Sequence, residues 1–134
     1  MQKAIGWCRK QSFSRSSVMP YRLLAANALG EFMSAIAHPR RIQIIEELRS
    51  GEIDVASLTK TLGVSHSNVS QHLAVLRAHR VVAERREGRR VFYRLRTVEL
   101  AEWLVRGMDF LAPMNLQAGE VRKAIKKAKS KWSD

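Results

Sequence analysis

The sequence has 134 residues, 46% of them hydrophobic, which fits one globular domain with its own core and excludes a disordered chain. Its apolar runs are far shorter than the roughly 20 residues of a membrane-spanning helix, so no membrane partner is expected. The net charge is +12 at pH 7, and eight arginines against two glutamates fall within residues 77–96, which indicates a polyanionic partner.

Residues 1–18 show no hydrophobic period, and we expect them to be poorly ordered. The segment lacks the continuous apolar stretch of a secretory signal, although its Arg and Ser content leaves a transit peptide open. Cys8 is the single cysteine, so it can form no intrachain disulfide, and we expect a cytoplasmic protein. Cys8 is a candidate redox-active thiol, but an incidental exposed thiol is the simpler interpretation.

Residues 19–112 form the expected domain, which begins with two helices. The first runs from Tyr21 to Ala37, with one apolar face made of Ala25, Leu29, Phe32, Met33 and Ile36. Pro39 suits the first turn of the second helix, and Ser50-Gly51 ends it. The buried stripe expected along this second helix is Ile42, Ile45 and Leu48.

A third, short helix is expected from Val55 to Leu62, with Gly63 as its C-terminal breaker. Ser65 suits the N-cap of a fourth helix that reaches Ala78, because its hydroxyl can accept a hydrogen bond from a first-turn amide. Apolar residues at helical spacing turn one side of this helix to the core: Val69, Leu73 and Leu76. The exposed first turns then carry five polar side chains: His66, Ser67, Asn68, Ser70 and Gln71.

The run AERREGRRVFYRL predicts a β-hairpin with its tip at Glu87-Gly88, because Val91, Tyr93 and Leu95 alternate along its second half. The hairpin and the preceding helix end carry five arginines: Arg77, Arg85, Arg86, Arg89 and Arg90. Thr97 can cap a last core helix, which Pro113 ends. Residues 113–134 are expected to be a basic tail that can be helical.

A short helix, a tight turn and a second helix with a small polar outer face are what insertion into the major groove of DNA requires, since that groove is about 12 Å wide. Asn68 and Gln71 can make the paired contacts that suit adenine. Arginines on a neighbouring hairpin can contact phosphates or the minor groove. A polar helix face is common and an arginine-rich hairpin alone is weak evidence, but the two together predict binding to duplex DNA.

The stretch from Ala37 to Leu95 resembles the ArsR/SmtB family of bacterial repressors, most specifically in VSHSNVSQHLAVLRAHRVV and REGRRVFYRL. The resemblance covers residues 29–111. It implies a mainly α winged helix-turn-helix fold, four helices, a β-hairpin and a helix, in a homodimer that leaves its operator when a signal arrives. It also implies a dimer interface on the first and last core helices, formed by Leu29, Phe32, Met33, Ile36, Leu100, Trp103, Leu104, Met108 and Leu111.

The sensing sites of that family are not matched in this sequence. Asp54-Val55-Ala56 stands where the arsenic- and cadmium-type site needs a CVC element, and Glu46 and Ala112 stand at the positions of the dithiol sensors. The last core helix offers no histidine for a zinc site, only Glu99, Glu102 and Asp109. We therefore predict no metal and no cofactor, and the sequence names no inducer.

Four histidines remain, and DNA contact, packing or capping explains each better than metal binding: His38, His66, His72 and His79. The leading function is a sequence-specific transcriptional regulator that represses a near-palindromic operator. The alternatives are a low-specificity architectural DNA-binding protein and a winged helix that binds RNA or protein. No catalytic motif stands out, so an enzyme is not expected.

Overall fold

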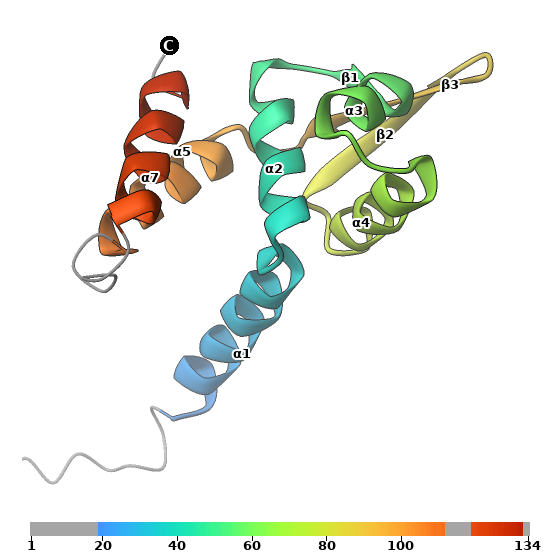
Figure 1. Ribbon diagram of the computed structural model, residues 1–134. Helices are drawn as coiled ribbons and strands as arrows, with labels where there is room; N and C mark the ends of the chain where they lie inside the picture. The colour runs from blue at the N-terminus through green and yellow to red at the C-terminus, as the bar shows by residue number, and fades with distance from the viewer. Residues whose placement is uncertain (1–18, 112–118, 133–134) are drawn as a thin grey trace, which may run out of the picture.

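The computed structural model describes residues 19–111 and 119–132 of the chain. In chain order its elements are α1 (Met19–Ile36), α2 (Pro39–Glu47), η1 (Leu48–Ser50), β1 (Ile53–Asp54), α3 (Val55–Leu62), α4 (His66–Ala78), β2 (Val82–Glu87), β3 (Arg90–Leu95), α5 (Glu99–Gly107), η2 (Met108–Phe110) and α7 (Gly119–Trp132). Figure 1 shows α2 at the centre, with α3, α4 and the strands on one side and α5 and α7 on the other. None of the described helices is long and apolar enough to cross a membrane.

The core lies between α2, α3, α4 and the sheet. Its fully buried side chains are aliphatic and come from all four of these parts and from η1: Ile44, Ile45, Leu48, Leu58, Leu73, Leu76, Val69 and Val82. The prediction of the α2 stripe was partly wrong, because Ile44 is fully buried while Ile42 is half-buried. The N–H of Arg40 donates to Nδ1 of His38 at 3.1 Å, so His38 caps the helix that Pro39 opens.

The sheet has three antiparallel strands in the order β1-β3-β2, one more than the sequence predicted. The extra strand β1 is two residues long and pairs Ile53 with Tyr93 and Asp54 with Phe92. Because Glu87 pairs with Arg90, the hairpin turn consists of Gly88 and Arg89, not of Glu87-Gly88 as expected. Gly88 has a φ of 60°, the left-handed conformation that tight hairpin turns require.

Helix α5 begins differently from the prediction. Its N-cap residue is Val98, with no side-chain cap, and Thr97 contributes only its carbonyl, which accepts the N–H of Leu100 at 3.3 Å. The helix tightens into η2 at Met108. Cys8, Ala112 and Pro113 lie outside the described residues.

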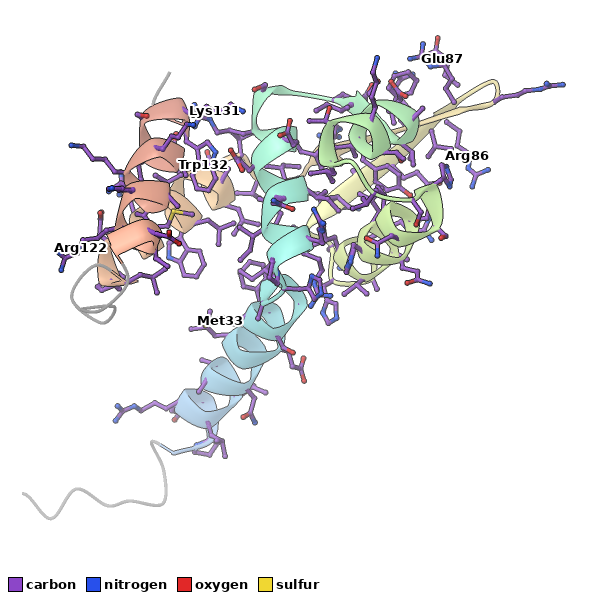
Figure 2. All side chains as sticks on the ribbon, in the orientation of Figure 1. Met33, Arg86, Glu87, Arg122, Lys131 and Trp132 are labelled. Atoms are coloured by element: carbon purple, nitrogen blue, oxygen red, sulfur yellow. The ribbon has the colours of Figure 1, made fainter. Side chains whose placement is uncertain are left out.

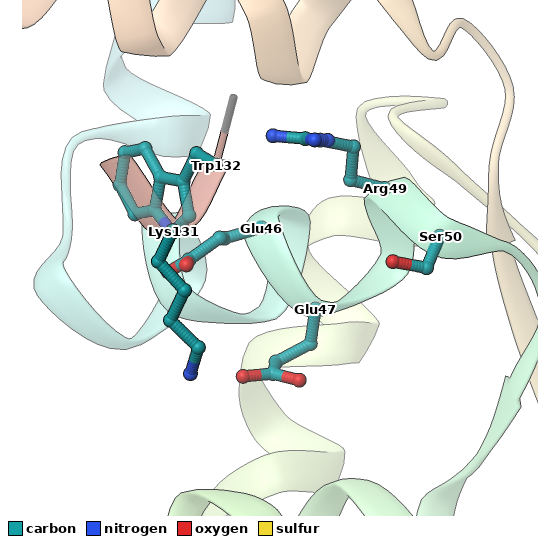
Figure 3. A pocket seen from close by; sticks show the side chains of 6 residues that line it. All are labelled: Glu46, Glu47, Arg49, Ser50, Lys131 and Trp132. Atoms are coloured by element: carbon teal, nitrogen blue, oxygen red, sulfur yellow. The ribbon is translucent and has the colours of Figure 1, made fainter. Parts of the chain in front are cut away.

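Residues 119–132 of the expected basic tail form the helix α7. Lys129 of α7 makes an ion pair with Asp109 of η2. At the C-terminal end of α7, the half-buried Trp132 lies beside Glu46 and Arg49 (Figure 3). The tail helix is thus in contact with α2 and with the end of the last core helix.

Helix α1 projects from the body of the molecule (Figure 1). Only its C-terminal end is buried, at Ala35 and Ile36, whereas Leu24 is 70% and Leu29 is 54% exposed. Met33 also points away from the body (Figure 2). Most of this 18-residue helix therefore has no tertiary packing in the single chain.

Candidate nucleic-acid interface

The two helices α3 and α4 are fixed by short-range caps on either side of a tight turn. The carboxylate of Asp54 caps α3, because the backbone N–H of Ser57 donates to its Oδ1 at 3.1 Å. Gly63 ends α3 with a φ of 62°. Ser65 caps α4 as predicted, with its Oγ accepting the N–H of Asn68 at 3.3 Å. The turn between the helices thus has a defined geometry.

Helix α4 turns the predicted apolar stripe inward, and Val69, Leu73 and Leu76 are fully buried. His66, Ser67 and Gln71 are exposed, whereas Asn68 and Ser70 are half-buried. The side-chain Oδ1 of Asn68 is buried and has no hydrogen-bond partner within the described part of the chain. The outward surface of the first turns therefore belongs mainly to His66, Ser67 and Gln71.

We call the β2–β3 hairpin the wing. A groove runs between α4 and the wing. Its volume is about 430 Å³. The groove is lined mainly by polar and charged residues of both walls and of the β1–α3 junction: Asp54, Val55, Ala56, His66, Ser70, Ala74, Arg77, Glu84, Arg86, Arg89, Arg90, Val91 and Tyr93. Four of the five predicted arginines thus line one concave surface together with two of the predicted base-reading residues. The fifth, Arg85, lies outside it.

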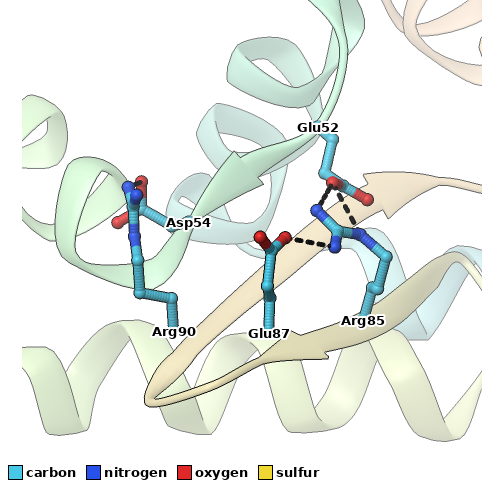
Figure 4. A network of polar contacts seen from close by, with 5 residues as sticks. All are labelled: Glu52, Asp54, Arg85, Glu87 and Arg90. Carbon is cyan, nitrogen blue, oxygen red and sulfur yellow. Dashed lines mark hydrogen bonds and ion pairs between the residues drawn. The ribbon is translucent and has the colours of Figure 1, made fainter.

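The wing arginines are more constrained than the sequence indicates. Arg85 donates from Nη2 and Nε to Oε1 of Glu52, at 2.6 and 3.0 Å, and from Nη1 to Glu87 at 2.6 Å (Figure 4). Arg90 pairs with Oδ2 of Asp54 at 2.9 Å. The guanidinium carbons of Arg85 and Arg90 lie 4.7 and 5.0 Å from the ring centroid of Phe92, within the range of a cation–π interaction.

Glu84 organises a second group of contacts on the groove side of the wing. It pairs with Arg77 and with Nε of Arg86 at 3.1 Å, and it accepts the hydroxyl of Tyr93 at 2.8 Å. The bonds from Tyr93 and Arg86 hold the pKa of Glu84 below its usual range. Burial, with Glu84 adding to it, raises the pKa of Tyr93 to about 12. Glu84 is therefore ionised and Tyr93 neutral at neutral pH.

Two further carboxylates that pair with arginines of the wing, those of Asp54 and Glu52, are also held in the charged form. The side-chain and backbone hydrogen bonds from Ser57, helped by Arg90, lower the pKa of Asp54. The hydrogen bond from Arg85 lowers the pKa of Glu52. Of the five predicted arginines, Arg89 alone makes no ion pair with the residues that the structure describes.

The sequence analysis missed all four of these carboxylates as parts of the site. Glu52 and Arg85 are 33 residues apart, and Asp54 and Arg90 are 36 apart, so no local spacing connects them. Asp54 did offer a signal, because an Asp directly before a helix is a common N-cap. Glu84 and Glu87 flank Arg85 and Arg86 in β2, but that pattern does not show which side chains meet.

The histidines do not form a metal site in the described ranges, where no three His, Cys, Asp or Glu side chains are grouped for one ion. The rings of His38 and His72 instead pack with centroids 4.4 Å apart, which connects the start of α2 to α4. Burial, followed by the charge of His38, lowers the pKa of His72. His72 is therefore a neutral packing residue at neutral pH.

The residues predicted for a dimer interface fall into two groups. Leu29, Met33, Trp103 and Leu111 are between 43% and 54% exposed, which leaves them accessible to a partner. Ile36 belongs to the core, and the half-buried Phe32, Leu100 and Leu104 already pack against that core within one chain. Met108 is half-buried.

Comparison with known proteins identifies the architecture just described. A family model described as the bacterial regulatory protein, arsR family, matches residues 38–84. The nodulation protein NolR of Rhizobium meliloti is 40% identical over 62 residues, which are 46% of this chain and 51% of NolR. The HTH-type transcriptional regulator Rv0081 of Mycobacterium tuberculosis is 40% identical over 83 residues, which are 61% of this chain and 73% of that protein.

The fold is shared with solved regulators. The crystal structure of NolR from Sinorhizobium fredii superposes with a TM-score of 0.61 at 29% identity, and the match covers 69% of this chain and 92% of that one. The chain spans about half the length of the curated NolR sequence, but most of the solved NolR chain. The matched region contains the helix-turn-helix. The chain therefore belongs to the ArsR/SmtB family of winged-helix transcriptional regulators.

Proposed function

We propose that this protein is a DNA-binding transcriptional repressor whose homodimer occupies a near-palindromic operator in the cytoplasm. The observation that carries the proposal is the groove between α4 and the wing, where His66 and Ser70 face Arg86 and Arg89 across one concave surface. A reading helix beside a cationic hairpin matches the major groove and its flanking phosphates. A low-specificity architectural role is the alternative.

The exposure of the α4 side chains divides their proposed roles. Ser67 and Gln71 are exposed on the outer face and would contact base edges, while His66 and Ser70 lie along the groove toward the wing. Asn68 contributes less to base reading, because its Oδ1 is buried. The paired contact with adenine that an amide side chain can make is therefore assigned to Gln71.

The dimer is proposed to form through α1 and the outer face of α5. An isolated helix whose first turns have no tertiary contact is marginally stable in water. We therefore expect the apolar side of α1 to pack against a second protomer. Trp103 of α5, Phe110 of η2 and the following Leu111 remain exposed, and none of them lines the crevice between α5 and Trp132 of α7. Two reading helices about 34–36 Å apart would then face successive major grooves of one duplex.

The test of this function is selection of bound duplexes from a random library, followed by affinity measurements at about 0.15 M salt. A repressor should recover a two-half-site motif and prefer it to random DNA by roughly 10³-fold or more. Equal affinity for all DNA sequences would contradict the repressor hypothesis and favour the low-specificity architectural role. Equally strong competition by double-stranded RNA would contradict both.

Gln71→Ala is expected to alter base preference at one or two positions and to cost about 1–3 kcal/mol on the selected operator. Affinity for random DNA should change little, because no phosphate contact is removed. The measurement is a repeat of the library selection with the variant. Gln43→Ala, an exposed glutamine on α2 outside the groove, is the matched control and should keep the original motif.

Glu52→Gln is expected to strengthen binding to all DNA sequences several-fold. Arg85 then loses the negative charge at Oε1 of Glu52, the oxygen that accepts from both its Nε and its Nη2, and keeps the ion pair with Glu87, so its guanidinium becomes more available to phosphate. The magnitude of the slope of log K against log salt should rise by up to about 1 per protomer. Glu102→Gln removes the same charge from an exposed position on α5 and should leave the slope unchanged. A Glu52→Gln protein with an unaltered slope would show that Arg85 does not face DNA.

A further inference from the structure

A second hollow lies on the other side of α2 from the α4–wing groove, where the C-terminal ends of α2 and α7 meet (Figures 1 and 3). Its volume is about 380 Å³. It is lined by four charged side chains, a serine and an indole: Glu46, Glu47, Arg49, Ser50, Lys131 and Trp132. We call it the α2–α7 pocket.

The two carboxylates of this pocket have no hydrogen-bond or ion-pair partner in the part of the chain that the structure describes. Glu46 and Glu47 are half-buried, yet the carboxylate of neither makes an ion pair or a hydrogen bond with any residue in 19–111 or 119–132. Burial, with the charge of Glu47 adding to it, raises the pKa of Glu46 to about 7. A carboxyl group that is withdrawn from water without a counter-ion is stabilised by any cation that reaches it.

The two cations of the pocket do not satisfy this need. The positive charges of Lys131 and Arg49 lower the pKa of Glu46. Its pKa is raised nevertheless, because burial and the charge of Glu47 have the larger effect. Lys131 is exposed, and in Figure 3 its side chain runs past Glu46 and ends on the side of Glu47, without an ion pair to either carboxylate among the described residues. The charges of Lys131 and Arg49 thus do not offset burial and the charge of Glu47 at the Glu46 carboxyl group.

Trp132 supplies an apolar and cation-binding wall. Trp132 is half-buried and, like Glu46 and Arg49, lines both the pocket and a narrow crevice formed by Ile42, Ala101, Leu104 and Val105. A cation over an indole face gains a cation–π interaction, and a carbon body beside the ring gains apolar contact. An inorganic cation would use the carboxylates but not this wall.

We propose that the α2–α7 pocket binds a small organic cation, an ammonium group on a short apolar body. The ammonium lies between the carboxylates of Glu46 and Glu47, and the body lies against Trp132. The volume accommodates a ligand of this size. This proposal does not depend on the proposed DNA binding. Ligand binding is measured on the protein without DNA, so the two proposals can fail separately.

The experiment is a titration of the ¹⁵N-labelled full-length protein with phenethylamine, followed by NMR. Saturable shifts are expected at residues 42–50 and at the Trp132 indole, with a Kd of about 10 mM or tighter. 3-Phenylpropionate has the same apolar body and the opposite charge, and it should cause no such shifts. Equal binding of the acid, or amine shifts that avoid this pocket, would overturn the proposal.

Glu46→Gln tests the carboxylate directly, and we expect it to weaken amine binding about tenfold or more. Glu102→Gln is the control and should bind as the parent does. The variant should fold, because a raised carboxyl pKa means that ionisation of Glu46 opposes folding as the pH rises toward 7 and above. A folded Glu46→Gln protein that keeps full affinity for phenethylamine would overturn the proposal.

The pH dependence provides a readout that a purely structural role of Glu46 would not change. The groups facing Glu46 are Glu47, Arg49, Lys131 and Trp132, and the ammonium stays charged throughout. Because about a tenth of Glu46 is ionised near pH 6 and about nine-tenths near pH 8, affinity should rise nearly tenfold across this range. In Glu46→Gln the rise should disappear, and a rise of the same size in that variant would assign the titration to another group.

Discussion

Replacing Arg86 and Arg89 together by alanine is expected to weaken binding to every DNA sequence by roughly 10²- to 10³-fold at about 0.15 M salt. Both side chains line the groove, and Arg89 occupies the exposed hairpin turn. If each contacts one phosphate in each protomer, the slope of log K against log salt should fall by roughly 3–4 for the dimer. The measurement is fluorescence anisotropy on operator and random duplexes over a range of salt concentrations.

This pair can be removed without breaking the fold. Arg89 makes no ion pair within the described residues, and loss of Arg86 leaves Glu84 bonded to Arg77 and Tyr93. The control is Arg122→Ala with Lys123→Ala on α7, which removes the same charge from exposed positions far from the wing (Figure 2). Equal losses in the two double variants would mean that total charge, rather than the wing, sets the affinity.

The helices and the hairpin were predictable because their signals are local. Ser65 caps α4 and Gly63 closes α3 through contacts within a few residues, and both positions were found from the sequence. The alternation of Val91, Tyr93 and Leu95 placed β3 correctly on the core side. Helix caps and strand alternation depend on residues only a few positions apart, so they can be recognised in a short stretch of sequence.

The features that were missed depend on contacts between distant segments. Strand β1 has only two residues, too few to show a period, and exists because Ile53 and Asp54 pair with β3. The pairing of Arg85 with Glu52 and the contact of Trp132 with α2 join parts of the chain that no local pattern relates. Sequence reasoning therefore identified which cations gather at the wing, but not which of them are already paired.

The same limit applies to the two helix faces that were assigned functions. Helical spacing placed Asn68 beside Gln71 and Ile36 beside Met33. Helical spacing could not show that the side-chain oxygen of Asn68 is buried or that Ile36 belongs to the core. A hydrophobic period shows that a residue is turned toward an apolar surface, but not whether that surface is the chain's own core or a partner.

The exposed Trp103 on α5 allows a direct test of the proposed homodimer. Trp103→Glu is expected to convert the protein from a dimer to a monomer, because it places a charge in the proposed contact between α5 helices. The side chain is 46% exposed in the single chain, so the fold of each protomer should persist. Sedimentation velocity and far-UV circular dichroism measure the two effects separately.

Loss of the dimer should lower affinity for a two-half-site operator by about 10²-fold or more, because the second half-site contact is no longer intramolecular. Affinity for a single half-site should change little, since α4 and the wing remain intact. Val121→Glu makes the same kind of change at a 38%-exposed residue of α7 and should remain dimeric with parental affinity. A Trp103→Glu protein that stays dimeric and binds the operator as the parent does would place the interface away from this face of α5.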